Sequence, residues 1–74
     1  MSRVSLGRCL LRDHLRSRKM SQAEFARRLD INKRMVSHYC NNEREMPLDV
    51  LYGASIILDI PMDQFYEFEF GNQQ

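Results

Sequence analysis

Side chains that can hydrogen-bond to nucleic-acid bases gather in one short segment. Lys33, Arg34, Ser37 and His38 recur at a spacing that places them on one side of a helix over residues 33–40. Lys and Arg donate to guanine O6 and N7, Ser accepts or donates, and His does either. A helix fits the major groove of DNA, so we expect these four side chains to face bases.

The distribution of charge along the chain also favours a polyanionic partner. The net charge is only +1, but all 11 Lys and Arg residues lie between Arg3 and Arg44. With the four acidic residues of residues 1–44, that part carries +7, and residues 45–74 carry six acidic residues and no base. We interpret the first part as a cationic working surface and the second as a separate acidic segment.

Composition limits the class of protein. The 74 residues are 43% hydrophobic and 28% charged, which predicts one small domain over residues 1–74. No stretch approaches the length of a membrane span, so no membrane partner is expected. Cys9 and Cys40 are too few for the disulfide framework of a small secreted domain, which favours a reduced, cytoplasmic protein.

The sequence shows no pattern of a metal, cofactor or catalytic site. The two cysteines, His14 and His38 lack the spacing of metal ligands. His38 and Cys40 are two residues apart and point to different faces of a helix, which argues against a catalytic pair. We expect no catalytic residue, no metal and no cofactor, and therefore no enzymatic activity.

Apolar periodicity and capping residues predict a mostly helical chain. Ser21 suits a helix N-cap, with Glu24 completing a capping box, and Asn32 suits the next N-cap. Asp30 lies where the chain must turn sharply. We expect helices over residues 10–18, 21–29, 33–40 and 47–58, with one more helical turn at residues 62–65.

Two helices have clear inner faces. The inner face expected for the third helix comprises Met35, Val36, Tyr39 and Cys40. The fourth helix is apolar on most sides, and its expected core face comprises Val50, Leu51, Ala54, Ile57 and Leu58. We expect Gly53 in that helix to allow the close approach of a neighbouring helix.

The two ends of the chain differ from its helical middle. Residues 66–70 alternate apolar and polar side chains as a half-buried strand does, and residues 4–9 also favour an extended segment. The ends should pair with each other or with another subunit, because a lone strand leaves its backbone unsatisfied. Alternatively, the first helix extends back to Leu6 and the tail is an irregular arm.

One face of the tail is too apolar for solvent. Tyr66, Phe68 and Phe70 should share it, and it should cover the helical core or meet a second subunit. A dimer formed elsewhere, for instance through the fourth helix, is the alternative.

The segment of about residues 21–40 has the pattern of a helix-turn-helix unit. Over roughly residues 10–66, the chain resembles the Cro and λ-repressor type of DNA-binding domain, also called the xenobiotic-response-element family. The residues that carry the resemblance are Met20 to Ala26, Leu29, Ile31, Asn32, Val36, Ser37, Pro47, Leu51, Leu58, and Asp63 to Phe65. The resemblance implies a mainly α, four- to five-helix λ-repressor-like domain. Short extended N- and C-terminal segments would flank the helices.

The chain departs from the family pattern at four positions. Asp30 and Asn42 occupy positions where many members have Gly, and both residue types tolerate positive φ. Leu15 and Cys40 stand where members have an Arg–Glu ion pair. Since both members are apolar here, we expect Leu15 and Cys40 to be buried and in contact.

The resemblance also implies which residues hold the DNA backbone. Gln22, at the start of the second helix, matches the residue that holds a phosphate in this family, assisted by the helix N-terminus. Asn41 and Arg44 would hold the backbone on the other side of the third helix. Arg18 and Lys19 would add further phosphate attraction.

The function implied is a sequence-specific transcriptional regulator, a repressor of bacterial or phage type. One unit reads only a few base pairs of double-stranded DNA, so a homodimer on a near-palindromic operator is expected. With no ligand domain, regulation would come from abundance, proteolysis or a regulatory protein partner. The alternative is a protein-interaction module, an antirepressor or adaptor that binds protein through the acidic, aromatic arm of about residues 66–74.

Overall fold

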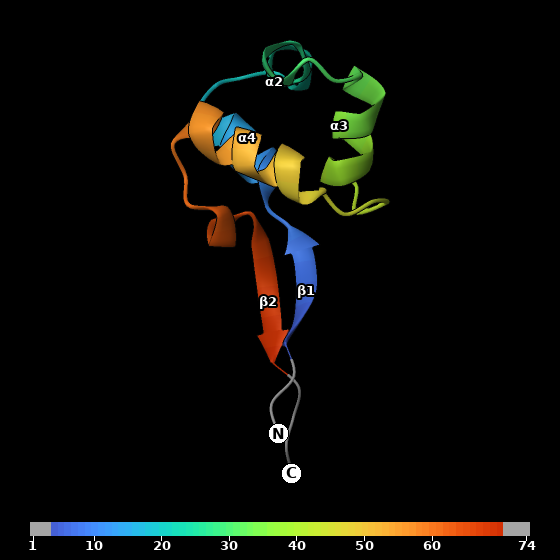
Figure 1. Cartoon of the computed structure of the whole chain (residues 1–74), viewed down its shortest axis with the longest axis vertical. Helices are drawn as coiled ribbons and strands as arrows, with labels where there is room; N and C mark the ends of the chain where they lie inside the picture. Colours follow the sequence, from blue (N-terminus) through green and yellow to red (C-terminus); the bar gives the residue numbers. More distant parts are fainter. Residues whose placement is uncertain (1–3, 71–74) are drawn as a thin grey trace.

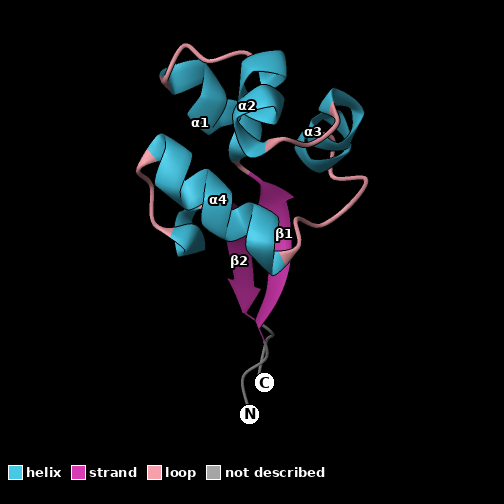
Figure 2. Cartoon of the chain, turned by 45° about the horizontal axis from the view of Figure 1, so that its top comes forward, coloured by secondary structure: helices cyan, strands magenta, loops and turns pink. Residues whose placement is uncertain are grey.

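The helices form one end of the molecule and a two-stranded ribbon projects from it (Figure 1). The computed structural model describes residues 4–70. The elements are β1 (Val4–Cys9), α1 (Leu11–Ser17), α2 (Gln22–Leu29), α3 (Lys33–Cys40), α4 (Leu48–Leu58), the 3-10 turn η1 (Met62–Gln64) and β2 (Tyr66–Phe70). This mainly α architecture with a small sheet confirms the expected fold class (Figure 2). No helix within residues 4–70 is long and apolar enough to cross a membrane.

The helices α2 and α3 begin at the residues that the capping pattern indicated. The Ser21 hydroxyl accepts a hydrogen bond from the Glu24 N–H at 3.0 Å, which starts α2. The Asn32 side chain accepts from the Arg34 N–H at 2.7 Å, which starts α3. Each cap satisfies a backbone donor that the first turn of a helix leaves free. Pro47 is the N-cap of α4 and lies one residue before the first turn expected for it.

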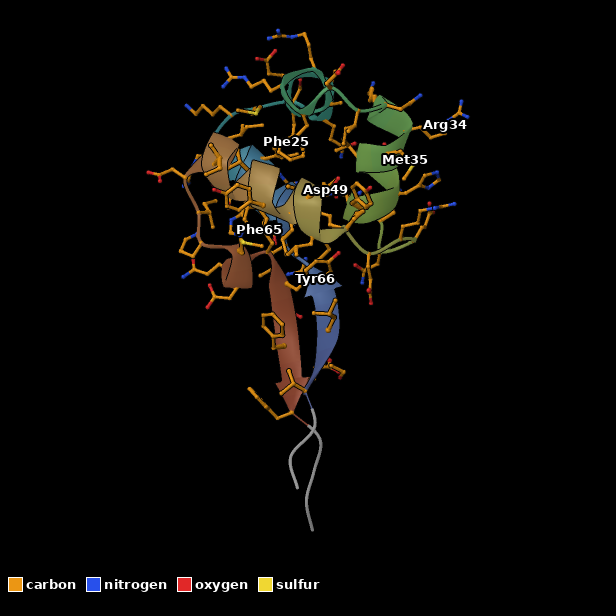
Figure 3. The ribbon with its side chains drawn as sticks, in the orientation of Figure 1. Phe25, Arg34, Met35, Asp49, Phe65 and Tyr66 are labelled. Carbon is orange, nitrogen blue, oxygen red and sulfur yellow. The ribbon has the colours of Figure 1, made fainter. Side chains whose placement is uncertain are left out.

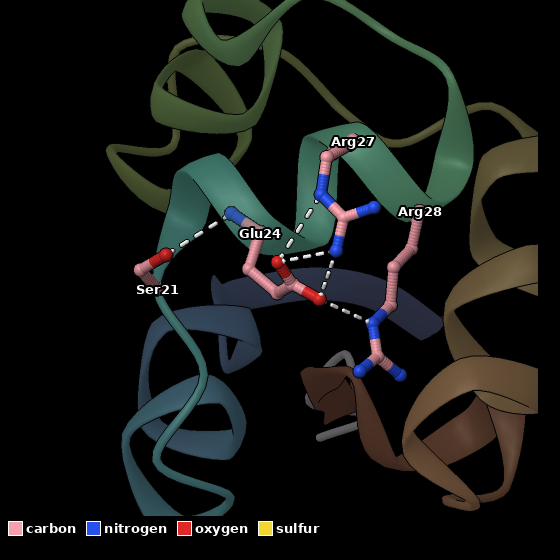
Figure 4. Close-up of polar contacts among 4 residues, drawn as sticks. All are labelled: Ser21, Glu24, Arg27 and Arg28. Atoms are coloured by element: carbon pink, nitrogen blue, oxygen red, sulfur yellow. Dashed lines mark hydrogen bonds and ion pairs between the residues drawn. The ribbon is translucent and has the colours of Figure 1, made fainter.

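The second half of the expected capping box is not formed. The Glu24 carboxylate turns instead toward the C-terminal end of α2, where Arg27 Nη2 lies 2.6 Å and Arg28 Nε 2.7 Å from Oε2 (Figure 4). Two guanidinium groups offer charged donors, which bind a carboxylate more strongly than a neutral N–H does. The hydrogen bonds from Arg27, and next the one from Arg28, lower the pKa of Glu24 from 4.5 to about 2.

Left-handed backbone conformations end three of the helices. Lys19 after α1, Asp30 after α2 and Asp59 after α4 have φ values of 56°, 59° and 56°. Asn42, two residues after α3, has φ 63°. The structure thus confirms that Asp30 and Asn42 adopt the conformation that many family members give to Gly.

The core lies between the four helices and the base of the ribbon. Its fully buried side chains include Leu11, Phe25, Val36, Ala54 and Phe65. Gly53 confirms the close approach expected of it, because a Cβ there would lie 2.5 Å from Cδ2 of Leu29.

Leu15 and Cys40 are both buried, as the loss of the family's ion pair suggested. Their exposed fractions are 3% and 8%. A buried ion pair is costly to desolvate, so two apolar side chains are an alternative filling of the same space. Direct contact between the two remains a prediction.

The two ends of the chain pair with each other in an antiparallel ribbon, and α1 does not extend back to Leu6. The cross-strand pairs are Val4–Phe70, Ser5–Glu69, Leu6–Phe68 and Cys9–Tyr66. One extra residue on β1 between Leu6 and Cys9 forms a bulge. Gly7 lies in this bulge, where a Cβ would be only 3.0 Å from the Glu67 carbonyl oxygen.

Only the base of the ribbon covers the core. Tyr66 is 7% exposed, and its hydroxyl oxygen accepts a hydrogen bond from the Met46 N–H at 2.9 Å. Phe68 and Phe70 are 42% and 70% exposed. The aromatic face thus covers the helical core at Tyr66 but not at its outer part, because the ribbon extends beyond the helices. The alternative expectation, that this outer part meets a second subunit, remains a prediction.

We expect Leu15→Ala to lower the free energy of unfolding by roughly 2–5 kcal/mol, since it leaves a cavity in the core beside α3. Arg16→Ala, an exposed change on the same helix, serves as the control and should shift it by less than about 0.5 kcal/mol. Urea unfolding followed by circular dichroism measures both. Equal midpoints for the two variants would contradict the core position of Leu15.

Glu24→Gln should lower the melting temperature at neutral pH, because the ionised carboxylate binds two guanidinium groups. Its pKa is depressed, so this stabilisation is complete above pH 4.5 and is lost as the pH falls toward 2. The difference in melting temperature between wild type and variant should shrink over that range. Glu45→Gln, an exposed carboxylate in a loop, controls for loss of charge. A difference that persists unchanged at pH 2 would contradict this role of Glu24.

Candidate nucleic-acid interface

The turn between α2 and α3 holds the two helices in one rigid unit. It comprises residues 30–32, and the Ile31 N–H donates to the Ala26 carbonyl oxygen at 3.0 Å. Phe25 and Ala26 of α2 and Val36 of α3 are buried. The inner faces of both helices are thereby used for packing, and the outer face of α3 is left for a partner.

Lys33 and Arg34 are exposed in the first turn of α3. Arg34 points away from the helical body, whereas Met35 is partly buried against the core (Figure 3). Both basic side chains are long enough to reach base edges from the N-terminal end of a helix. The structure therefore presents two of the four predicted base-reading residues on the free side of α3.

Ser37 and Gln22 are brought together across the unit. The Ser37 hydroxyl donates to Gln22 Oε1 at 3.0 Å, and both side chains are partly buried. Because the amide oxygen of Gln22 accepts this bond, its amide nitrogen keeps both of its N–H donors. The sequence had placed these residues in separate roles, and the structure joins a predicted base contact to a predicted phosphate contact.

His38 has an acidic neighbour that the sequence reasoning missed. Its Nδ1 lies 2.5 Å from Oε1 of Glu43, in the loop after α3, and the His38 side chain is 32% exposed. Protonation of His38 turns this contact into an ion pair. The only signal in the sequence was the five-residue separation, and a pair at that distance meets only if the chain turns back after α3.

Arg12 is a second residue that the sequence reasoning missed. It lies on α1 and its guanidinium contacts the side-chain oxygen of Asn41, the residue that ends α3. The amide nitrogen of Asn41 remains a donor, so the pair offers several N–H groups on one exposed surface. Arg44 is exposed in the loop that follows. The cationic surface at the C-terminal end of α3 is therefore built by two helices and a loop.

Arg18 and Lys19 lie after α1 in different situations. Arg18 Nε donates to the Leu58 carbonyl oxygen at 3.1 Å, at the C-terminal end of α4, where a cation is favourable. Lys19 is exposed and has a left-handed backbone. Arg18 thus contributes to joining α1 to α4, and a phosphate contact by either residue remains a prediction.

Cys9 and Cys40 are both buried free cysteines. Burial raises the pKa of Cys9, and it raises the pKa of Cys40 to about 11. A thiol with such a pKa is a poor nucleophile at neutral pH. In the part of the chain that the structure describes, His, Cys, Asp and Glu side chains form no group of three that could hold a metal ion.

The helix-turn-helix fold described above is also found in known proteins. The family model described as helix-turn-helix matches residues 11–65. Among solved structures, the chain is similar to SinR, described as the master regulator for biofilm formation in complex with DNA, with a TM-score of 0.68 and 20% sequence identity. The match covers 74% of this chain and 89% of that chain. No curated protein matches the sequence.

The family match includes every helix described above, the caps of α2 and α3, and the turn between them. At 20% identity the likeness to SinR supports the fold alone. The chain belongs to the Cro/C1-type helix-turn-helix family, whose members are DNA-binding transcriptional regulators rather than enzymes.

Proposed function

We propose that this chain is a sequence-specific repressor of bacterial or phage type that binds a near-palindromic operator as a homodimer. The observation that carries the proposal is the exposed N-terminal turn of α3, where Lys33 and Arg34 project from a helix whose opposite face is buried. A packed core alone does not require a basic outer face on this helix. SinR, which has a similar fold, was solved in complex with DNA, and this supports DNA as the partner.

The proposal separates residues that read bases from residues that hold the backbone. Lys33, Arg34, Ser37 and His38 face bases. Gln22, Asn41 and Arg44 hold phosphates, with Arg18 and Lys19 adding attraction at the end of α1. We add Arg12 to the phosphate group, because it shares the surface of Asn41.

Two contacts modify how these residues act. The Gln22 amide, oriented by Ser37, donates to a phosphate at the N-terminus of α2, so Ser37 positions a backbone contact as well as facing the groove. Glu43 next to His38 reduces the positive charge on that side of α3. Attraction without sequence preference on this side of α3 therefore rests on the phosphate-holding residues Arg44 and Arg12.

Arg34→Ala and Arg44→Ala test the two roles. An operator is first selected from a random DNA pool, and each variant is titrated against this duplex and a scrambled one at several salt concentrations. Arg34→Ala should cost about 1–3 kcal/mol on the operator and little on the scrambled duplex. Arg44→Ala should weaken both duplexes alike and reduce the salt slope by about one unit per monomer.

Arg16→Ala removes the same charge from an exposed position on α1 and serves as the control. If Arg34→Ala weakened both duplexes equally, its role would be backbone attraction. If neither variant differed from the control, the orientation of α3 would be wrong and the protein-interaction function would be favoured. A reporter promoter that overlaps the operator distinguishes a repressor, which lowers transcription, from an activator.

A further inference from the structure

The outer half of the ribbon presents an apolar face that no other described residue covers. Cross-strand partners lie on the same face of a sheet, so the pairs Val4–Phe70 and Leu6–Phe68 form one surface. These side chains are 56%, 70%, 39% and 42% exposed, in that order. Contiguous apolar surface of this kind is uncommon on a small protein unless something binds there.

The other face of the ribbon is charged. Glu67 and Glu69 alternate with the aromatic residues of β2, and Arg8 Nη2 lies 3.6 Å from Oε2 of Glu67. These carboxylates suit solvent and disfavour the approach of DNA phosphates. The ribbon is therefore not part of the DNA surface, and only its apolar face requires a partner.

The ribbon is held firmly against the helices. Tyr66 inserts into the core and binds the Met46 N–H, and the Leu10 N–H donates to the Phe65 carbonyl oxygen at 2.8 Å. The Cys9 N–H donates to the Asn42 side chain at 2.9 Å. Asn42 lies in the loop that follows α3, so this last bond joins β1 to the end of α3. A partner on the apolar face is therefore held in a fixed position relative to α3.

We propose that the partner is a second copy of this chain, packed ribbon on ribbon about a two-fold axis parallel to the strands. The apolar face carries no charged group to pair with a protein of different chemistry. It has an aliphatic column, Val4 and Leu6, beside an aromatic column, Phe68 and Phe70. Rotation about such an axis places each aromatic column over the partner's aliphatic column, so large side chains meet smaller ones.

The direction of the axis has a consequence for DNA. An axis parallel to the strands keeps both helical bodies at the same end of the dimer, where two copies of α3 can approach one duplex. An axis in the interface perpendicular to the strands would place the bodies at opposite ends and stack the aromatic columns on each other. The part of the dimer in DNA binding rests on the proposed function. The apolar surface is inferred from the exposed residues alone.

The size of the face predicts a weak dimer. The two Phe rings expose roughly 200 Å², whereas a stable interface buries about 800 Å² per partner. We therefore expect a dimer that dissociates at micromolar concentrations and is strengthened when both copies bind one operator.

Tryptophan fluorescence tests the surface, because the chain contains no Trp. In Phe68→Trp, the emission should move to shorter wavelength as the protein concentration rises from nanomolar to high micromolar. Tyr52→Trp, at a 58% exposed position on α4, is the control and should show no such shift. A Phe68→Trp spectrum independent of concentration, or a shift in the control instead, would overturn the proposal.

Sedimentation tests the same surface by disruption. The double variant Phe68→Thr, Phe70→Thr keeps residues that favour a strand and should sediment as a monomer where the wild type is a dimer. The matched control Tyr52→Gln, Ile56→Gln changes the exposed side of α4 and should remain dimeric. A ribbon variant that stays dimeric, or an α4 variant that dissociates, would place the interface elsewhere.

DNA binding separates this inference from the proposed function. The ribbon variant should bind a duplex with a single half-site with the affinity of the wild type and lose the cooperative binding to two half-sites. If it kept that cooperativity, the ribbon would not be the dimer surface although the DNA function stands. If the wild type bound neither duplex, the proposed function would fail while sedimentation still decided the dimer.

Discussion

The left-handed backbone at Asp30 is the constraint on which the position of α3 and its exposed basic residues depends. With φ 59° and ψ 45°, Asp30 ends α2 and redirects the chain within three residues. A non-glycine residue in this region costs about 1 kcal/mol or more. The packing of Phe25 and Val36 in the core offsets that cost, because both side chains are inside only if α3 crosses α2 at this angle. The positions of Lys33 and Arg34 follow from it.

Contacts among polar residues then hold the surface in one arrangement. Ser37 binds Gln22 across fifteen residues, and Arg12 binds Asn41 across twenty-nine. In each contact an amide oxygen accepts, so the amide nitrogens of Gln22 and Asn41 keep their N–H donors. The pair of His38 and Glu43 differs, because it places a carboxylate beside α3. That carboxylate lowers the positive charge on this side of α3.

The ribbon gives the acidic half of the chain a structural role. Tyr66 joins β2 to the core, and the bulge at Gly7 keeps Cys9 on the same face as Leu6 despite the three-residue step. Without the bulge, either Leu6 or Cys9 would point to the charged face. The chain ends therefore form an extension of the helical core that is apolar on one side and acidic on the other.

The local interactions of this protein could be predicted from its sequence. The N-caps Ser21 and Asn32, the turn at Asp30 and the bounds of α3 follow from contacts within four residues, and the structure confirms them. The alternation of residues 66–70 also predicted a strand from local sequence, although this strand pairs with the distant β1. Helical periodicity also placed Lys33 and Arg34 on the exposed side of α3, while the contacts of all four predicted base-reading residues with DNA remain predictions.

Only the tertiary structure decided the interactions between distant segments. Arg12 of α1 contacts Asn41 at the end of α3, and Arg18 after α1 contacts the Leu58 carbonyl oxygen at the end of α4. No local pattern encodes either proximity. The Glu24 carboxylate binds Arg27 and Arg28 rather than the backbone N–H of its capping box. Sequence spacing alone does not predict this, because all of these donors are within reach and the charged ones bind more strongly. The exposure of Phe68 and Phe70 likewise required the direction of the ribbon, since alternation shows that a strand has an apolar face but not what covers it.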